Sequence, residues 1–260
     1  MSRGTKQLVY GLFYVILLGA VLFLIFSPKL IPAPSCYDAI QNQGETGIDC
    51  GGPCIPCYLK EAKPLEIPAA PSIFKSESLG KAFAAVLAVN QNQSLGMHSF
   101  SYHVQFFDGS NNLVETVTGY DNIFPGESKY LVAEYDGSAY DVGRITSAVF
   151  SVTGAVSWAK ATDFIVPALS VSAGPTLSSS TNQVALTGTL ANGSPINIPA
   201  VKVVGFVLDK YGDPLFVGST VVNDVGSFGN SGFSILFPLE VFSGIDLTGA
   251  KPEVYLYAEE

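Results

Sequence analysis

The strongest pattern in the chain is one long apolar run near its start, followed by short alternating segments over most of the remaining length. Residues 8–26 (LVYGLFYVILLGAVLFLIF) form a run of 19 residues without a charge or a proline. An α-helix rises about 1.5 Å per residue, so this run spans about 28 Å, close to the roughly 30 Å of a bilayer's hydrocarbon core. The pattern therefore predicts a transmembrane helix over residues 8–26.

The charges beside this run predict its orientation. Arg3 and Lys6 precede it, and Lys29 follows it. Positive residues favour the cytoplasmic side, so we expect residues 1–7 to form a cytoplasmic tip and the C-terminal bulk to lie outside the cell membrane, in a single-pass arrangement.

A cleaved signal peptide is the main alternative to an uncleaved signal anchor. Signal peptides have an apolar core of about 7–15 residues and end at a small-residue cleavage site. Here the run is longer and ends in Phe26, Ser27 and Pro28. A lipid-modified Cys36 is a further alternative, but Ala33 stands where such signals carry Leu. The pattern favours a signal anchor, although the sequence alone does not decide whether the segment is cleaved.

From about residue 73 the chain changes to short runs of β-branched and aromatic residues divided by Gly, Asn, Asp and Pro. In residues 99–107, for example, every second side chain from Phe100 to Phe106 is apolar, which is typical of a half-buried strand. The same pattern of residue types predicts strands at 83–89, 99–107, 112–118, 128–134, 145–152, 184–190, 201–208, 214–222, 232–237 and 252–257.

The two halves of this region follow one plan. Landmarks recur about 100 residues apart, near the usual size of one domain. They are Asn92-Gln-Ser against Asn192-Gly-Ser, 104–108 against 206–209, and 112–113 against 214–215. We therefore predict an all-β fold of two tandem Ig-like β-sandwich domains, at 73–166 and 167–260, that arose by duplication.

The second half carries a more specific pattern. A strand with V-x-V is followed by an aromatic or aliphatic pair, an Asp and a turn with Gly. A later strand ends in Phe-Pro. The residues of this pattern are Val201 to Asp209, Gly212 to Leu215 and Phe233 to Pro238, with a weaker likeness at 102–113 and 125–131. This pattern resembles the small β-sandwich family named for its FxLYD motif. The family is not known for a defined catalytic site, so the resemblance implies only the fold and a surface context.

All four cysteines lie in one short segment. They are Cys36, Cys50, Cys54 and Cys57. An even number of cysteines in an exported chain predicts disulfides, and a segment this short needs cross-links because it cannot bury a core. Four cysteines allow three pairings, which the sequence does not distinguish. A Pro-rich stalk at 27–35 precedes the segment, and a Pro-rich linker at 58–72 follows it, which we expect to be extended and semi-rigid.

Residues 36–57 resemble a short cysteine module of bacterial and archaeal surface proteins, C-x-D-x-x-x-N-x-x-E-T-G-x-D-C-G-G-x-C-x-x-C, with Ala39 where Gly is more usual. Two metal-binding alternatives compete with a rigid spacer. Oxygen ligands at intervals of three and four residues are compatible with calcium, and the candidates are Asp38, Asn42, Glu45 and Asp49. A four-cysteine zinc site is the other, although an exported chain favours oxidation.

Charge and histidine content argue against several functions. The net charge is −9, and residues 72–260 hold 17 acidic against eight basic side chains, so we expect no nucleic-acid binding. The two histidines, His98 and His103, lack further ligands at metal-binding spacing. No Gly-x-Ser-x-Gly elbow or phosphate loop is present. The sequence therefore predicts a protein that is not an enzyme.

Together these patterns predict a membrane-anchored, surface-exposed protein of a prokaryotic cell envelope. We expect its two β-sandwich modules to bind an unknown envelope protein or glycan, or to serve as a scaffold. The alternatives are a self-assembling envelope component and an accessory or sensor subunit of a membrane complex. Aromatic side chains are the candidates for an adhesive surface, namely Tyr120, Tyr130, Tyr135 and Tyr140, whereas Trp158 is expected in the first core.

Overall fold

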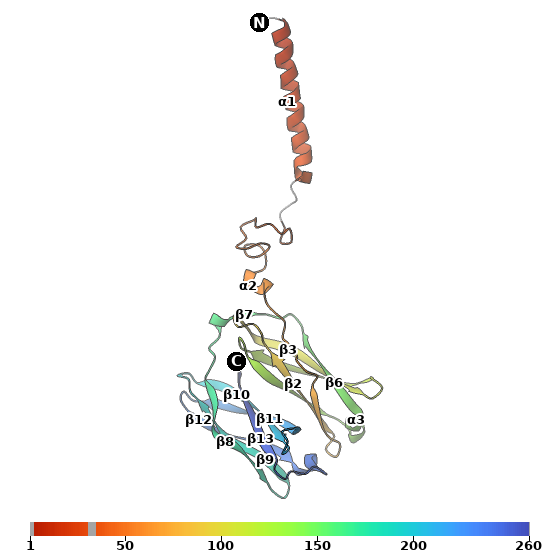
Figure 1. The fold of residues 1–260 in the computed structure, drawn as a ribbon, viewed down its shortest axis with the longest axis vertical. Helices are drawn as coiled ribbons and strands as arrows, with labels where there is room; N and C mark the ends of the chain where they lie inside the picture. Colours follow the sequence, from red (N-terminus) through yellow and green to blue (C-terminus); the bar gives the residue numbers. More distant parts are fainter. Residues whose placement is uncertain (1–2, 31–34, 260) are drawn as a thin grey trace. The chain divides into compact units, whose positions relative to one another are not determined.

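The computed structural model describes residues 3–30 and 35–259. The chain divides after Glu61 into two compact units, and each is described by itself below (Figure 1). The predicted cytoplasmic tip and stalk fall partly on residues 1–2 and 31–34, which lie outside the described residues.

The first unit begins with helix α1 (Arg3–Leu30). Within residues 3–26 of this helix, an 18-residue window has a mean hydropathy of 2.7 and is not buried by protein, so the helix is long and apolar enough to cross a membrane. The predicted span of 8–26 lies within it. After the undescribed residues, the chain forms a compact segment without regular strands that ends in the short helix α2 (Cys57–Lys60).

The first half of the second unit is a sandwich of two antiparallel sheets. One sheet has the order β1-β2-β5 and the other the order β4-β3-β6, with the short β7 also paired to β3. The elements are β1 (Ser72–Ser76), β2 (Lys81–Val89), β3 (Leu95–Asp108), β4 (Leu113–Ile123), β5 (Ser128–Asp136), α3 (Ala139–Arg144), β6 (Ile145–Thr153), β7 (Ala159–Lys160) and η1 (Ala161–Asp163).

The second half pairs its strands in the corresponding order, β8-β9-β12 and β11-β10-β13. The elements are β8 (Leu169–Ser179), β9 (Gln183–Asn192), β10 (Ile198–Leu208), β11 (Pro214–Val225), β12 (Asn230–Pro238), η2 (Leu239–Phe242) and β13 (Lys251–Glu259). The prediction of an all-β fold with an N-terminal apolar helix is confirmed.

Alternation places one face of each strand in a core. In β3 the residues Phe100, Tyr102, Val104 and Phe106 are at most 4% exposed, as the sequence pattern predicts. Alternate residues of β2 and β5, including Val86 and Leu131, face them and complete the core of the first half.

The opposite face of β1, β2 and β5 is also apolar, and it packs on the second half. The Phe74 ring lies 5.9 Å from that of Phe216, and the Tyr130 ring lies 4.9 Å from that of Phe206. One continuous core therefore contains Phe74 and Ala85 together with the interior of the second half. The four sheets are stacked, with β1-β2-β5 and β11-β10-β13 as the two inner layers.

The predicted linker 58–72 is only partly a connection. From Ala62 onward the chain belongs to the second unit. Glu66 and Val89 exchange two backbone hydrogen bonds of 2.9 Å, and Leu65 and Ile67 pack against the first core. The apolar side chains of this stretch hold it on the sandwich, and residues 58–60 of the predicted linker belong to helix α2.

Candidate functional site

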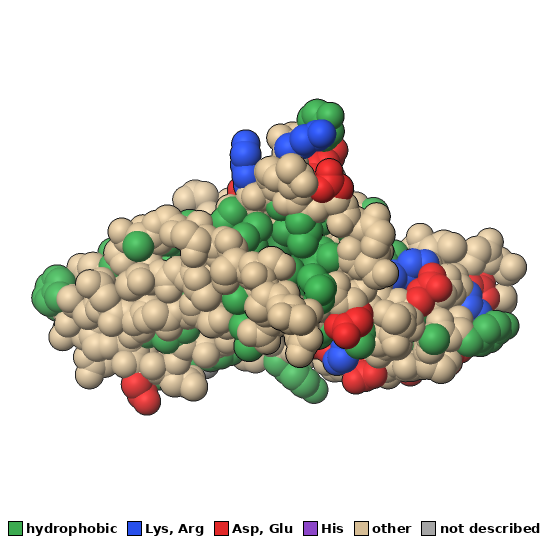
Figure 2. Space-filling model, turned by 90° about the horizontal axis from the view of Figure 1, so that it is seen from below, with side chains coloured by type: hydrophobic (Ala, Val, Ile, Leu, Met, Phe, Trp, Pro, Cys, Tyr) green, Lys and Arg blue, Asp and Glu red, His purple; other side chains and the backbone are tan. Residues whose placement is uncertain are grey.

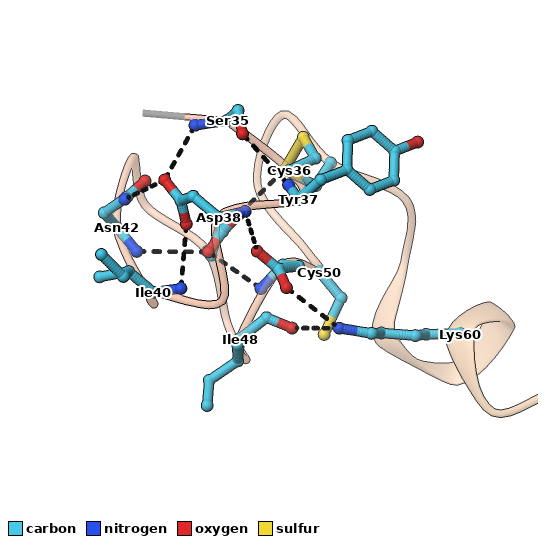
Figure 3. The surroundings of a disulfide bond; sticks show 12 residues. Ser35, Cys36, Tyr37, Asp38, Ile40, Asn42, Ile48, Cys50 and Lys60 are labelled. Atoms are coloured by element: carbon cyan, nitrogen blue, oxygen red, sulfur yellow. Dashed lines mark hydrogen bonds and ion pairs between the residues drawn. A yellow bond between two sulfur atoms is a disulfide. The ribbon is translucent and has the colours of Figure 1, made fainter. Parts of the chain in front are cut away.

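The cysteine segment of the first unit is held by two disulfides. Cys36 is joined to Cys54, and Cys50 to Cys57 (Figure 3 shows the surroundings). The predicted disulfides are confirmed, and the structure selects one of the three possible pairings. Because all four sulfurs are bonded, the described residues offer no free thiolate to zinc.

The glycines of this segment permit a close turn between the cysteines. Gly51 and Gly52 have φ of +80° and +58°, and a Cβ on Gly51 would lie 2.1 Å from the Thr46 hydroxyl oxygen. Ala39 also adopts a left-handed φ of 59°, a conformation that glycine adopts more readily than other residues.

The four predicted calcium ligands lie in this segment, and three of their carboxylates accept backbone N–H groups (Figure 3). One oxygen of Asp49 accepts from the amides of Asp38 and Ala39, at 3.0 and 2.9 Å, and the other lies 3.6 Å from the Lys60 ammonium. The buried Glu45 carboxylate accepts from the amides of Asn42 and Asp49. These bonds organise the turns between the cysteines.

Asp38 completes the arrangement. Its carboxylate accepts from the Asn42 side chain at 3.0 Å and from the Ser35 amide at 3.1 Å, and these hydrogen bonds hold the pKa of Asp38 below its usual value. Because the carboxylates already have partners that explain the fold, the geometry assigns them a structural role. Calcium binding stays a prediction.

The histidines and tyrosines named above are not gathered into one site. The His98 ring stacks on Phe164 with 4.1 Å between ring centroids. Tyr130 packs in the junction between the halves, and the Tyr135 ring lies 6.0 Å from that of Phe106. Tyr120 and Tyr140 are exposed. Two of the four candidate adhesive tyrosines are therefore used in packing.

A buried polar cluster joins the halves. The Asp121 carboxylate, 1% exposed, accepts from the Lys129 ammonium at 2.7 Å and from the Lys202 ammonium at 2.8 Å. Lys129, itself 0% exposed, also donates to the Asn122 side chain and carbonyl. Burial lowers the pKa of Lys202, but the Asp121 charge and hydrogen bond outweigh it and raise that pKa above its usual value.

A groove of about 570 Å³ opens where the halves meet. One wall is the outward face of β2 and β5, which presents Lys81, Phe83, Val132 and Glu134. The other wall consists of residues 216–220 of β11 and 234–238 of β12, and Leu79 and Val241 also line the groove. Figure 2 shows hydrophobic side chains gathered across the middle of one face of the molecule, with charged side chains beside them.

The wall on β2 and β5 changes from apolar to charged along the strands. Val132 and Phe83 belong to the shared core or pack on it, whereas Lys81 bonds to Glu134 and lies 3.3 Å from Asp136. The hydrogen bond to Glu134 raises the pKa of Lys81. Sequence patterns did not indicate this groove, because its walls come from strands of different halves and meet only through packing.

A second cavity, of about 460 Å³, lies beside the first sandwich. Leu65, Ile67, Phe150 and Trp158 are among its lining residues. Trp158 packs against the first core, but it is only partly buried and forms part of the cavity wall.

Comparison with known proteins leaves the chain without a family. No family model matches it, and no curated protein matches it. Three solved structures with partial likeness are a transglutaminase of red sea bream and β-glucuronidases of Bacteroides uniformis and Parabacteroides merdae. Their identities to the chain are 14%, 11% and 11%, and their TM-scores are 0.22, 0.23 and 0.19.

The aligned regions cover 69%, 64% and 88% of this chain but only 27%, 23% and 34% of those three chains. TM-scores this low carry no argument about this protein.

Proposed function

We propose that the chain is a membrane-anchored, non-enzymatic protein of a prokaryotic cell envelope that presents its β unit outside the membrane to bind another protein. The observation that carries this proposal is the order of its parts. An apolar helix is followed by a disulfide-bonded segment, and the β unit comes after both. Disulfides persist in oxidising compartments, so they favour export of everything beyond the helix.

The charges around α1 support the same orientation. Arg3 and Lys6 lie at its N-terminal end, which favours a cytoplasmic N-terminus. The resemblance to FxLYD modules and the matching strand order of the halves support a duplicated sandwich of a surface protein. The groove between the halves is the feature that favours binding over a passive spacer role.

The first test is of topology. The full chain would be expressed with a C-terminal epitope in bacterial cells, and spheroplasts would be treated with a protease that does not cross the membrane. We expect the epitope to be lost from intact spheroplasts and all four cysteines to resist a thiol-reactive maleimide until reduction. An epitope that is cleaved only after lysis, together with reactive thiols, would contradict export.

The same preparation separates the alternatives. Sedimentation of the full chain in detergent micelles is expected to show a single copy per micelle. Ordered oligomers would instead favour the self-assembling component. A partner that is retained only when α1 is present would favour the accessory-subunit role.

A further inference from the structure

Four strands border the groove between the halves, namely β2, β5, β11 and β12, and all but β2 use only one of their edges in the described sheets. β11 pairs with β10, β12 with β9, and β5 with β2. The other edge of each carries backbone N–H and C=O groups that a further strand can bind. β11 lines the groove with residues 217–220, and β12 lines it with residues 234–238.

The side chains next to this edge form an apolar depression. Phe83 and Phe216 lie with ring centroids 5.2 Å apart, and Val132 lies beside them in the groove wall. Leu236 of β12 also lines the groove, and it is 57% exposed although it is a large apolar side chain on a strand. A strand places every second side chain on one face, so one that runs along β11 would direct alternate side chains into this depression.

Two glycines allow the free edge of β11 to lie this close to the groove. Gly205 and Gly218 face each other across β10 and β11. A Cβ on Gly218 would lie 2.6 Å from the Phe237 ring and 2.8 Å from an Ile235 methyl group. The small residues therefore let Ile235 and Phe237 of β12 pack closely against β11.

The charged end of the groove indicates one property of the occupant. Lys81 lies between Glu134 and Asp136, so this end carries one more negative than positive charge. Glu134 remains 47% exposed. A cationic side chain of the occupant would complete the pairing, in line with electrostatic complementarity at interfaces.

We propose that this groove binds an extended peptide segment of a partner protein, which adds as a strand to the free edge of β11 at residues 217–220. Alternate apolar side chains of the segment occupy the depression formed by Phe83, Val132 and Leu236, and a Lys or Arg of the segment pairs with Glu134. The proposal deepens the proposed function and rests on it, since the partner must reach the β unit outside the membrane.

The groove chemistry favours a peptide over a glycan. Of the aromatic rings that line the groove, Phe216 and Phe237 are only 2% and 3% exposed, so they offer almost no ring face to a sugar. The unpaired backbone edge, in contrast, matches the hydrogen-bonding pattern of a second backbone.

The test uses the full chain in detergent micelles and a phage-displayed library of random nine-residue peptides as the probe. We expect enriched peptides with apolar residues at alternate positions and one Lys or Arg. A synthetic copy of an enriched peptide should then bind at least tenfold more weakly to Leu236→Lys and to Glu134→Lys. Val149→Lys is the matched control, because Val149 is a 50% exposed strand residue outside the groove.

Backbone hydrogen exchange provides a second readout. Bound peptide should slow exchange at residues 217–220 and leave β6 unchanged. Enriched peptides that bind all three variants equally, or that leave exchange of β11 unchanged, would overturn the proposal. A glycan that binds the chain and is lost in Leu236→Lys, with no peptide enriched, would also overturn it.

The topology test above separates this proposal from the broader one. If the β unit is exported but no peptide is enriched, the groove proposal fails and the proposed function stands. If the β unit is not exported, the proposed function fails, whatever the groove binds.

Discussion

Asp121 forms ion pairs with lysines of both halves. It lies on β4 of the first half and accepts from Lys129 of the same half and from Lys202 of the second. Removing one member of a buried ion cluster leaves the others in a low-dielectric site without a counter-charge. The junction therefore depends on Asp121 more than on any exposed ion pair at the surface, because those pairs are solvated when they are broken.

Asp121→Asn is expected to lower the free energy of unfolding by about 3–5 kcal/mol, since two buried ammonium groups lose their shared carboxylate. Asp136→Asn is the matched control, because the Asp136 side chain is 71% exposed and its loss should change stability by less than about 1 kcal/mol. Urea unfolding followed by circular dichroism measures both. Equal stability of the two variants would contradict a structural role for the cluster.

The raised pKa values of Tyr257 and Lys202 predict that the protein loses stability at high pH. Burial raises the pKa of Tyr257 far above its usual value, and Asp121 raises that of Lys202 against the effect of burial. Both groups hold their protons longer in the folded state than in the unfolded state. Their contribution is therefore fully present below about pH 10 and is lost as the pH rises above it.

We expect the free energy of unfolding to be nearly constant from pH 8 to 9 and to fall above about pH 10, by up to roughly 1.4 kcal/mol per pH unit for each such group. Tyr257→Phe should fall less steeply, although it is less stable at neutral pH because Tyr257 accepts from the Tyr130 amide at 2.9 Å. Urea titrations at several pH values test this. An unchanged slope in Tyr257→Phe would assign the alkaline loss to other groups.

At the scale of elements, alternation predicted strands well where one face is buried. All ten predicted segments fall on or largely within observed strands. Three strands were not predicted. β1 and β8 are edge strands, and β7 (Ala159–Lys160) has only two residues. β8 is rich in Ser, and most of its side chains are exposed. Its alternation is interrupted in the middle, where Gly174 and Pro175 lie and the register shifts against β9.

The sequence landmarks that were paired between the two halves were partly misaligned. Asn192 donates to the carbonyls of Ile196 and Gly226. The residue with the corresponding bonds in the first half is Asn90, which donates to Leu95 and Phe124. The sequence comparison paired Asn192 with Asn92 because Asn-x-Ser is conspicuous, whereas the buried role of Asn90 is visible only in the fold. Asp108 and Asp209 do correspond, since each accepts two amides of its own turn.

The cysteine segment and the β unit should respond independently to reduction. No cysteine follows Cys57, so the β unit has no cross-link to lose. We expect reduction to leave the melting temperature of the β unit unchanged and to increase hydrogen exchange in residues 36–57, because a segment without its own core depends on cross-links. Peptide mapping of the unreduced chain should recover Cys36 with Cys54 and Cys50 with Cys57. A lower melting temperature of the β unit would contradict this independence.

At the scale of the whole molecule, the sequence suggested two sandwiches, and it did not show that the core of the second half extends to Phe74 and Ala85 of the first half, which also has a core of its own. The sequence did carry a sign of this packing, but the sign was ambiguous. Phe83, Tyr130 and Val132 alternate with the inward residues of β2 and β5, so both faces of the sheet are apolar. A run that is apolar on both faces predicts burial on both sides but does not identify the covering element. The groove was unpredictable for the same reason, because its walls depend on how the halves pack.

A shared core predicts that the halves unfold together. Calorimetry of the full chain in detergent micelles should show one transition for residues 62–260 in which the calorimetric and van't Hoff enthalpies agree, since neither half can separate without exposing Phe74, Phe206 and Phe216.

Phe74→Ala removes a 7% exposed ring from this junction and should lower the free energy of unfolding by about 3–5 kcal/mol. Because Phe74 belongs to the first half but packs on the second, the variant should lower the stability of both halves or split the transition in two. Val149→Ala, on an exposed face of the first half, should do neither. Two transitions in the unsubstituted protein, with Phe74→Ala affecting only one, would mean that the halves are independent domains, and the groove between them would then lack a rigid second wall.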